Sequence, residues 1–163
     1  MSLDRSRARG FTLIELLVVI TVMAVLLGLA VPSFSNFIAS QRVKTVAYDL
    51  TTAFVLARSE AVKRNADVTV AAASASDWTQ GWTVKVGPTS GPTTLQQQQP
   101  VTGVTITKAA SASAIPASFV YSASGRMTSG SGTQYLQING ASFSKCVKID
   151  TTGIPSTQSV ACL

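Results

Sequence analysis

The chain has 163 residues and a formal net charge of +6, with 46% hydrophobic residues, no histidine and two cysteines. This length suits one membrane segment and one modest domain. The lack of histidine excludes His-based catalytic triads and most zinc sites, and the basic charge permits attraction to DNA or acidic surfaces without identifying either.

A basic leader opens the chain, over residues 1–10, and an apolar segment of 21 residues follows it, from Phe11 to Val31. About 20 apolar residues are needed to cross a bilayer as a helix. Three arginines precede the segment, namely Arg5, Arg7 and Arg9. They predict that the leader stays in the cytoplasm and that the remainder of the chain is exported. Residues 11–31 are therefore predicted to form a transmembrane helix.

One carboxylate, Glu15, lies within the apolar segment. A charged side chain in hydrocarbon costs at least a few kcal/mol, so Glu15 requires a partner that lipid does not supply. A cleaved secretory signal has a shorter apolar region, of roughly 7–15 residues, and its small-residue cleavage site is only partly matched near Ala30. A plain membrane anchor explains the length of the segment but does not explain Glu15.

Beyond Pro32 the pattern becomes that of an amphipathic helix. Apolar residues recur there at steps of three or four: Val43, Val46, Leu50, Phe54, Ala57 and Ala61. Residues 32–66 are therefore predicted to form the second half of one long helix, which lies against a sheet and stops at Asn65. Gly28 and Pro32 interrupt the joint between the halves, because proline removes a backbone donor and clashes with the preceding turn. A kink or a locally melted turn is expected there.

After Asn65 the hydrophobic period changes to two, and residues 67–163 are predicted to form an antiparallel β domain. A long helix followed by such a domain makes the fold class α+β. Alternating segments between turn signals predict six or seven short strands, at 68–71, 82–86, 94–96, 104–107, 118–121, 135–138 and 146–149. Asn139-Gly140 is a strong hairpin signal. The glutamine run 96–99 is expected to be a loop or a strand edge, and 111–114 a loop of small residues.

The two cysteines, Cys146 and Cys162, lie in the part of the chain that is predicted to be exported. An oxidising periplasm favours a disulfide between them, with two free thiols as the alternative. The bond would close a 17-residue loop, counted from 146 to 162 inclusive. The loop-entropy relation gives such a bond about 3 kcal/mol of stabilisation.

The run Arg7-Ala8-Arg9-Gly10-Phe11-Thr12-Leu13-Ile14-Glu15-Leu16 resembles the prepilin signature of type IV pilins and type II secretion pseudopilins. The resemblance implies that a prepilin peptidase cuts between Gly10 and Phe11 and methylates the new amine of Phe11. It also implies that Glu15, fifth in the mature chain, is the assembly glutamate. Pro32 then stands at the twenty-second position, where many members of the family have a proline.

Three further segments resemble the GspH/FimT branch of this family: Ala57–Ala61, Asp77–Val84 with its two tryptophans, and Phe119–Tyr121 followed by Gly125-Arg126. The resemblance implies a pilin-like minor pilin or minor pseudopilin, which assembles with other minor and major pilins or pseudopilins. It implies a single-pass protein of the bacterial inner membrane, with a periplasmic globular domain, that then enters a pilus or pseudopilus. The late cysteine pair resembles that of FimT and FimU pilins, which favours the pilus.

Some members of this branch bind DNA through arginines in a C-terminal loop, and the corresponding stretch here, 153–158, contains none. Because Arg and Lys supply most non-specific DNA affinity, this argues against DNA uptake by that route. Three other basic residues remain as candidates for DNA contact, namely Arg126, Lys145 and Lys148. No nucleotide-binding loop and no carboxylate pair is recognisable, so neither a cofactor nor enzymatic activity is expected. The chain is instead expected to be a substrate of the peptidase.

Overall fold

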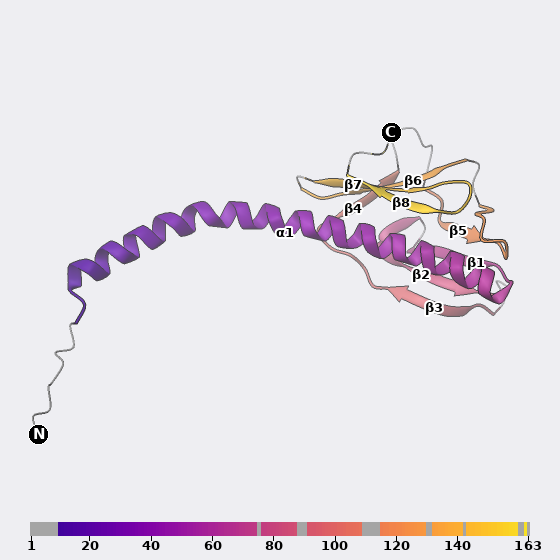
Figure 1. The fold of residues 1–163 in the computed structure, drawn as a ribbon, viewed down its shortest axis with the longest axis horizontal. Coiled ribbons are helices and arrows are strands. Elements are labelled where there is room, and N and C mark those ends of the chain that lie inside the picture. The colour runs from indigo at the N-terminus through magenta and orange to yellow at the C-terminus, as the bar shows by residue number, and fades with distance from the viewer. Residues whose placement is uncertain are drawn as a thin grey trace, which may run out of the picture. The chain divides into compact units, whose positions relative to one another are not determined.

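The computed structural model describes residues 10–74, 76–87, 91–108, 115–129, 132–141, 143–159 and 162, and it describes only the backbone of residues 29–33. The chain divides into two compact units, Met1–Asn36 and Phe37–Leu163. The described residues form one helix and eight strands, in the order expected of an α+β chain (Figure 1). The predicted leader, apart from Gly10, and the predicted loop 111–114 lie outside the described residues.

Helix α1 (Leu13–Arg64) begins in the first unit. Its described apolar side chains up to Gly28 are all exposed to solvent. Among the described residues, no helical stretch meets the length and hydropathy needed to cross a membrane. The backbone is helical at Gly28 and Pro32 as well. The kink at this joint and the domain boundaries at 31/32 and 66/67 stay predictions.

In the second unit, α1 buries the face that the sequence predicted. All six predicted apolar positions are buried: Val43, Val46, Leu50, Phe54, Ala57 and Ala61. The helix ends as expected at Asn65, whose φ of 49° is in the left-handed region. The amide of Asn65 donates to the carbonyl of Val62 at 3.4 Å, and the amide of Ala66 donates to that of Ala61 at 3.2 Å. This pair of bonds is a Schellman cap, which satisfies carbonyls that the last turn leaves open.

The first sheet has the order β3-β2-β1-β5, and its neighbouring strands are antiparallel. Its strands are β1 (Val68–Ser74), β2 (Asp77–Val86), β3 (Thr93–Gln98) and β5 (Ser118–Tyr121). Val68 pairs with Val86 on one side and Tyr121 on the other, so one face of the sheet is apolar and turns to the core. Most of the glutamine run 96–99 belongs to β3, which is an edge strand. Of the two alternatives for this run, a loop or a strand edge, the strand edge is therefore confirmed.

The second sheet has the order β4-β6-β7-β8 and is also antiparallel. Its strands are β4 (Thr105–Lys108), β6 (Gln134–Asn139), β7 (Ser144–Ile149) and β8 (Pro155–Gln158). The predicted hairpin after Asn139 is confirmed, since β6 and β7 pair and the amide of Gly140 donates to the carbonyl of Phe143 at 2.8 Å.

The prediction of six or seven strands was too low, because it missed β8. β8 is a short edge strand that pairs with β7. Its side chains alternate between half-buried and exposed, but its sequence, Pro-Ser-Thr-Gln, has no alternation of apolar and polar residues that would predict a strand. Proline is tolerated at such an edge because no ladder bond is required of its nitrogen.

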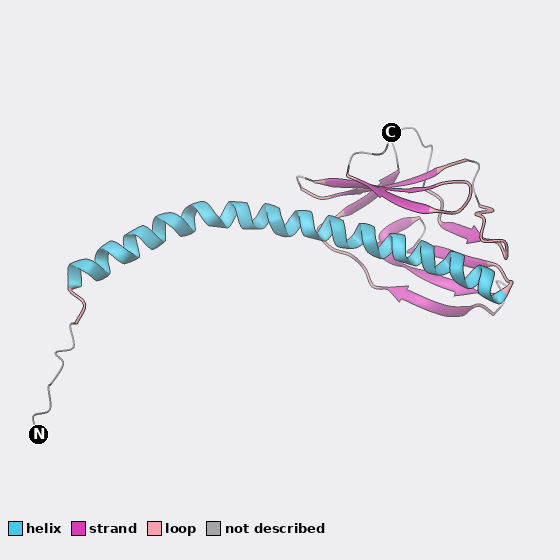
Figure 2. Cartoon of the chain, viewed as in Figure 1, coloured by secondary structure: helices cyan, strands magenta, loops and turns pink. Residues whose placement is uncertain are grey.

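The core of the second unit lies between α1 and the two sheets, whose strands appear on two sides of the helix in Figure 2. Phe54 of α1 meets Phe119 edge-on, with ring centroids 5.3 Å apart, and Trp78 lies 5.4 Å from Phe119. The indole nitrogen of Trp78 donates to the carbonyl of Pro116 at 3.0 Å. Trp78 and Trp82 are fully buried, so the paired tryptophans are core residues.

Candidate assembly site

The start of α1 is set by Thr12. Residues Gly10 to Thr12 are not helical, and the amide of Glu15 donates to the Thr12 hydroxyl oxygen at 3.2 Å. The amide of Leu16 donates to the Thr12 carbonyl, also at 3.2 Å, as the first bond of the helix. Threonine at the N-cap with glutamate three residues on is the residue pattern of a capping box. The bond predicted to be cut, between Gly10 and Phe11, therefore lies just outside the helix.

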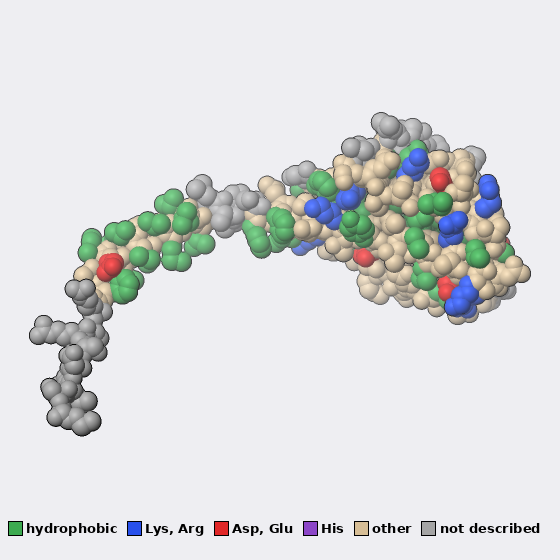
Figure 3. Space-filling model, viewed as in Figure 1, with side chains coloured by type: hydrophobic (Ala, Val, Ile, Leu, Met, Phe, Trp, Pro, Cys, Tyr) green, Lys and Arg blue, Asp and Glu red, His purple; other side chains and the backbone are tan. Residues whose placement is uncertain are grey.

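Glu15 lies in the first turn of the helix, where the aligned peptide dipoles favour a negative charge. Its neighbours Leu13, Ile14 and Leu16 are exposed apolar side chains, as Phe11 is. Among the residues that the structure describes, no cation forms a salt bridge with the Glu15 carboxylate. A carboxylate on an otherwise apolar, exposed helix surface is available to a cation from another chain. Figure 3 shows how hydrophobic side chains dominate this part of the helix.

At the other end of α1, a hydrogen bond joins two of the segments that resemble the GspH/FimT branch. The Nε of Arg58 donates to the carbonyl oxygen of Gly125 at 3.0 Å, across 67 residues of sequence. Arg58 therefore holds the turn that follows β5. The hydroxyl of Tyr121, in β5, donates to the carbonyl of Gly153 at 3.1 Å, and burial raises the pKa of this tyrosine.

The loop from Asp150 to Ile154, which joins β7 to β8, is fixed by one carboxylate. Oδ1 of Asp150 accepts hydrogen bonds from the Thr152 amide at 2.9 Å, the Thr152 hydroxyl at 2.6 Å and the Ile154 amide at 3.0 Å. The pKa of Asp150 is lowered, mainly because its carboxylate accepts the hydrogen bond from the Thr152 side chain. Gly153 is buried in this loop, whereas Ile154 is exposed.

Near the end of α1, Glu60 pairs with two cations that follow it in the sequence. Its carboxylate lies 2.5 Å from Nε of Arg64 and 3.7 Å from Nζ of Lys63. The pKa of Glu60 is lowered, mainly because its carboxylate accepts the hydrogen bond from Arg64. The two ion pairs lie in the last turn of α1, where the cations also complement the helix dipole.

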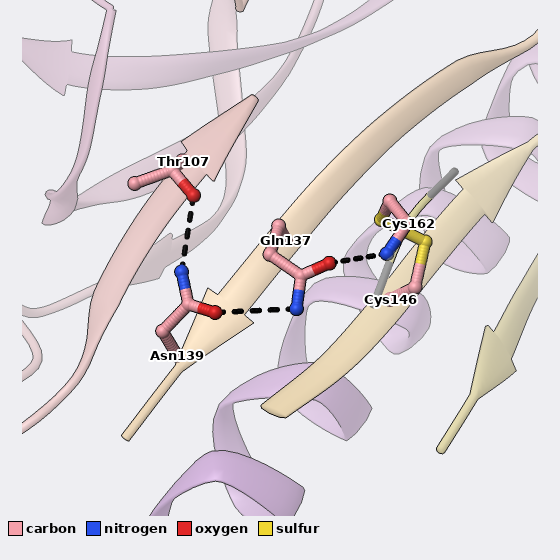
Figure 4. The surroundings of a disulfide bond; sticks show 5 residues. All are labelled: Thr107, Gln137, Asn139, Cys146 and Cys162. Atoms are coloured by element: carbon pink, nitrogen blue, oxygen red, sulfur yellow. Dashed lines mark hydrogen bonds between the residues drawn. A yellow bond between two sulfur atoms is a disulfide. The ribbon is translucent and has the colours of Figure 1, made fainter. Parts of the chain in front are cut away.

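The predicted disulfide between Cys146 and Cys162 is confirmed, with the two Cα atoms 5.1 Å apart. Figure 4 shows a chain of side-chain amides beside it. Oε1 of Gln137 accepts a hydrogen bond from the Cys162 amide, and Nε2 of Gln137 donates to Oδ1 of Asn139 at 3.2 Å. Nδ2 of Asn139 in turn donates to the Thr107 hydroxyl at 3.1 Å. The C-terminal end of the chain is thus held against the second sheet by covalent and polar bonds.

The residues predicted to contact DNA are not gathered on one surface. Lys145 is only 8% exposed, and its ammonium lies 5.5 Å from the centre of the Tyr48 ring and 3.5 Å from the Ser159 hydroxyl. Lys148 is half-buried and, three residues along the same strand, lies on the opposite face of β7. Arg126 is exposed in the turn after β5.

Several residues of these arrangements were missed by reasoning from the sequence. Thr12 carried a usable signal, because Thr-x-x-Glu before an apolar run is a capping pattern. The contacts of Arg58, Asp150 and Gln137 carried none, since each depends on which distant strands become neighbours.

Comparison with protein families gives two matches. Residues 46–153 match the model described as Type II transport protein GspH, and residues 5–31 match that of the prokaryotic N-terminal methylation motif. No curated protein matches the sequence.

Three solved structures share the fold. Two are crystal forms of the type IV minor pilin FimU of Pseudomonas aeruginosa PAO1. The first has a TM-score of 0.61 at 17% sequence identity, and the match covers 74% of this chain and 89% of the FimU chain. The second has a TM-score of 0.59 at 18% sequence identity, and the match covers 71% of this chain and 91% of the FimU chain. The third is the minor pseudopilin EpsH of the Vibrio cholerae type 2 secretion system, with a TM-score of 0.53 at 16% identity and coverages of 74% and 97%. These similarities confirm the pilin-like α+β fold. The chain therefore belongs to the GspH family, and it is a minor pilin or pseudopilin of the type IV pilus and type II secretion class.

Proposed function

We propose that the chain is a minor pilin of a type IV pilus, cut between Gly10 and Phe11 by a prepilin peptidase and methylated on the amine of Phe11. The position of Glu15 carries the processing and assembly part of this proposal: its carboxylate lies in the first capped turn of an exposed apolar helix, inside the stretch that matches the methylation motif. The disulfide between Cys146 and Cys162 supports the pilus, because the late cysteine pair resembles that of FimT and FimU pilins. The backbone from Gly10 to Thr12 is not helical, so the bond that would be cut lies outside the hydrogen-bonded turns of α1.

Before assembly, residues 11–31 hold the protein in the bacterial inner membrane, with the arginines of the leader on the cytoplasmic side. The globular unit is then periplasmic, where the disulfide between Cys146 and Cys162 forms and persists. The exposed apolar side chains of α1 support this placement, because water is a poor solvent for them and lipid or other apolar helices are good ones.

Assembly then brings these helices together into a bundle. Cleavage frees a positively charged amine at Phe11, and the Glu15 carboxylate of one subunit meets such an amine on a neighbour. An uncompensated buried charge costs about 3–5 kcal/mol, so registers that leave either group unpaired are disfavoured. The apolar surface supplies the affinity, and the ion pair sets the stagger in the initiating or tip complex.

A pseudopilin of a type II secretion system is the second candidate, favoured by the GspH match and by the fold shared with EpsH. A DNA-binding pilin for natural transformation is a third, supported only by exposed Arg126 and half-buried Lys148. The test is deletion of the gene in its host, with restoration of the full chain as the control. Surface pili, twitching, protein secretion and transformation are assayed side by side.

Loss of pili and twitching with normal secretion supports the pilus proposal. Loss of secretion with normal pili refutes it in favour of the pseudopilin. Loss of transformation alone refutes it in favour of a DNA-binding role.

A further inference from the structure

A hollow of about 530 Å³ lies between the C-terminal part of α1 and the loop before β8. It is lined by Val55, Arg58, Ser59, Val62, Lys63, Ile154 and Pro155, and is called here the helix–loop groove. All of these residues belong to the second compact unit. On the face of that unit drawn in Figure 3, hydrophobic side chains lie among basic and acidic ones.

The groove exposes aliphatic side chains that the fold does not cover. Val55 is 51% exposed, Val62 is 55% exposed and Ile154 is 49% exposed. Val55 and Val62 are seven residues apart, which places them on one face of α1, two turns from each other. This face is separate from the one that carries Phe54, Ala57 and Ala61 into the core. The helix therefore leaves two valines open on this face, among the polar side chains of Arg58, Ser59 and Lys63.

The loop side of the groove is built to hold Ile154 in place. The Ile154 amide donates to Oδ1 of Asp150 at 3.0 Å, and the Asp150 amide donates to the Ile154 carbonyl at 3.3 Å. A Cβ added at Gly153 would meet Cε1 of Tyr121 at 2.7 Å, so the loop backbone is seated directly on β5. An exposed isoleucine on a backbone this well bonded loses little conformational entropy when a partner binds it.

The charges of the groove have one sign. Among the described residues, its lining includes Arg58 and Lys63 and no acidic residue. The Glu60 carboxylate, one turn away on α1, is held mainly by Arg64 at 2.5 Å and more loosely by Lys63 at 3.7 Å, and the Lys63 side chain stays 76% exposed. An occupant that buries aliphatic side chains here is therefore best matched when it also brings a carboxylate, because complementary charge favours encounter and fixes orientation.

We propose that the helix–loop groove binds a segment of a neighbouring subunit that carries aliphatic side chains next to a carboxylate. The aliphatic side chains contact Val55, Val62 and Ile154, and the carboxylate lies within reach of Arg58 and Lys63. The proposal rests on the proposed function in one respect, namely that the neighbour is another chain with an N-terminal methylation motif.

The test is site-specific photo-crosslinking of the full-length chain in its host. A photoreactive amino acid replaces Ile154, and in a matched control it replaces exposed Thr105 of β4, at the other edge of the second sheet. The cross-linked peptide is sequenced by mass spectrometry. We expect an adduct from position 154, but not from 105, with an Asp- or Glu-containing segment of a protein that has the methylation motif.

Two second-site changes sharpen the test. In the chain with the probe at 154, Val62→Asp and Lys63→Glu should each lower the adduct yield about tenfold, as the loss of an interface anchor does. Lys63→Arg and Thr105→Asp should leave the yield unchanged. Equal yields from positions 154 and 105, an adduct with lipid or nucleic acid, or a peptide without a carboxylate would overturn the proposal.

The same samples separate this proposal from the proposed function. The mass of the chain shows directly if the leader has been removed after Gly10. A chain that keeps its leader refutes the proposed function, whereas a processed chain without the adduct refutes the groove alone.

Discussion

Replacement of Gly153 by alanine probes the contact that seats the loop before β8. Gly153 has a φ of +81°, and an added Cβ would lie 2.7 Å from Cε1 of Tyr121 and 2.8 Å from the carbonyl oxygen of Gly125. A left-handed backbone costs a non-glycine residue about 1–2 kcal/mol. Overpacking against neighbours that cannot withdraw adds about 1–3 kcal/mol. We therefore expect Gly153→Ala to lower the free energy of unfolding by about 2–5 kcal/mol.

Gly132 offers a matched control, because it has the same φ of +81° and an added Cβ there meets nothing within 4 Å. Gly132→Ala should lose only the backbone part, about 1–2 kcal/mol. The difference between the two variants measures the steric contact with Tyr121 and Gly125, free of the backbone strain that both share.

Urea unfolding of residues 37–163, the second compact unit, is the assay. With a slope of about 2 kcal/mol per molar urea, the midpoint of Gly153→Ala should fall by roughly 1–2.5 M, and that of Gly132→Ala by roughly 0.5–1 M. Equal shifts in the two variants would refute the reasoning, because the loop would then be free to move away from β5.

Four other predictions concern processing, assembly and stability. Gly10→Val should leave the leader attached, and a chain of mature mass in the mutant strain would contradict the cleavage site. Glu15→Ala should still reach the membrane but should not co-purify with other minor subunits; normal co-purification removes its assembly role. Cys146→Ser combined with Cys162→Ser should cost about 3 kcal/mol of unfolding free energy, and an unchanged urea midpoint would show that the bond does not stabilise the domain. Since the folded-state pKa of Asp150 is below its ordinary value of 3.8, its contribution is complete above that value and is lost as the pH falls through the folded pKa. Asp150→Asn should therefore flatten the decline in stability in acid, measured by thermal melts from about pH 5 to pH 2; an unaltered decline would rule this out.

The parts of the fold that follow from neighbouring residues could be predicted from the sequence. The helix repeat identified the buried face from Val43 to Ala61, and Asn65 identified the stop, because both depend on geometry within a few residues. The leader motif is local in the same way, and residues 5–31 do match the N-terminal methylation motif, whereas the roles of Gly10, Phe11 and Glu15 stay predictions.

Features that depend on distant neighbours could not be predicted. The division of the strands into two sheets, and the bond from Arg58 to Gly125, follow from which strands come together across tens of residues. Lys145 was one of three basic residues that the sequence left as candidates for DNA contact. Side chains alternate between the two faces of a strand, and the position of Lys145 in β7 turns it toward α1, where its ammonium lies over the ring of Tyr48.

The disulfide has a consequence for how separate copies of the chain behave toward one another. Strand β8 forms an edge of its sheet, and in the sequence it lies between Cys146 and Cys162, so both of its ends are tethered to β7 or to the residues beside it. An edge strand that detaches exposes a row of unpaired backbone groups, which is a template for strand addition by another molecule. In the assembly proposed above, where similar subunits would be crowded together, the covalent loop would keep β7 covered and leave helices and side-chain surfaces to make the contacts between subunits.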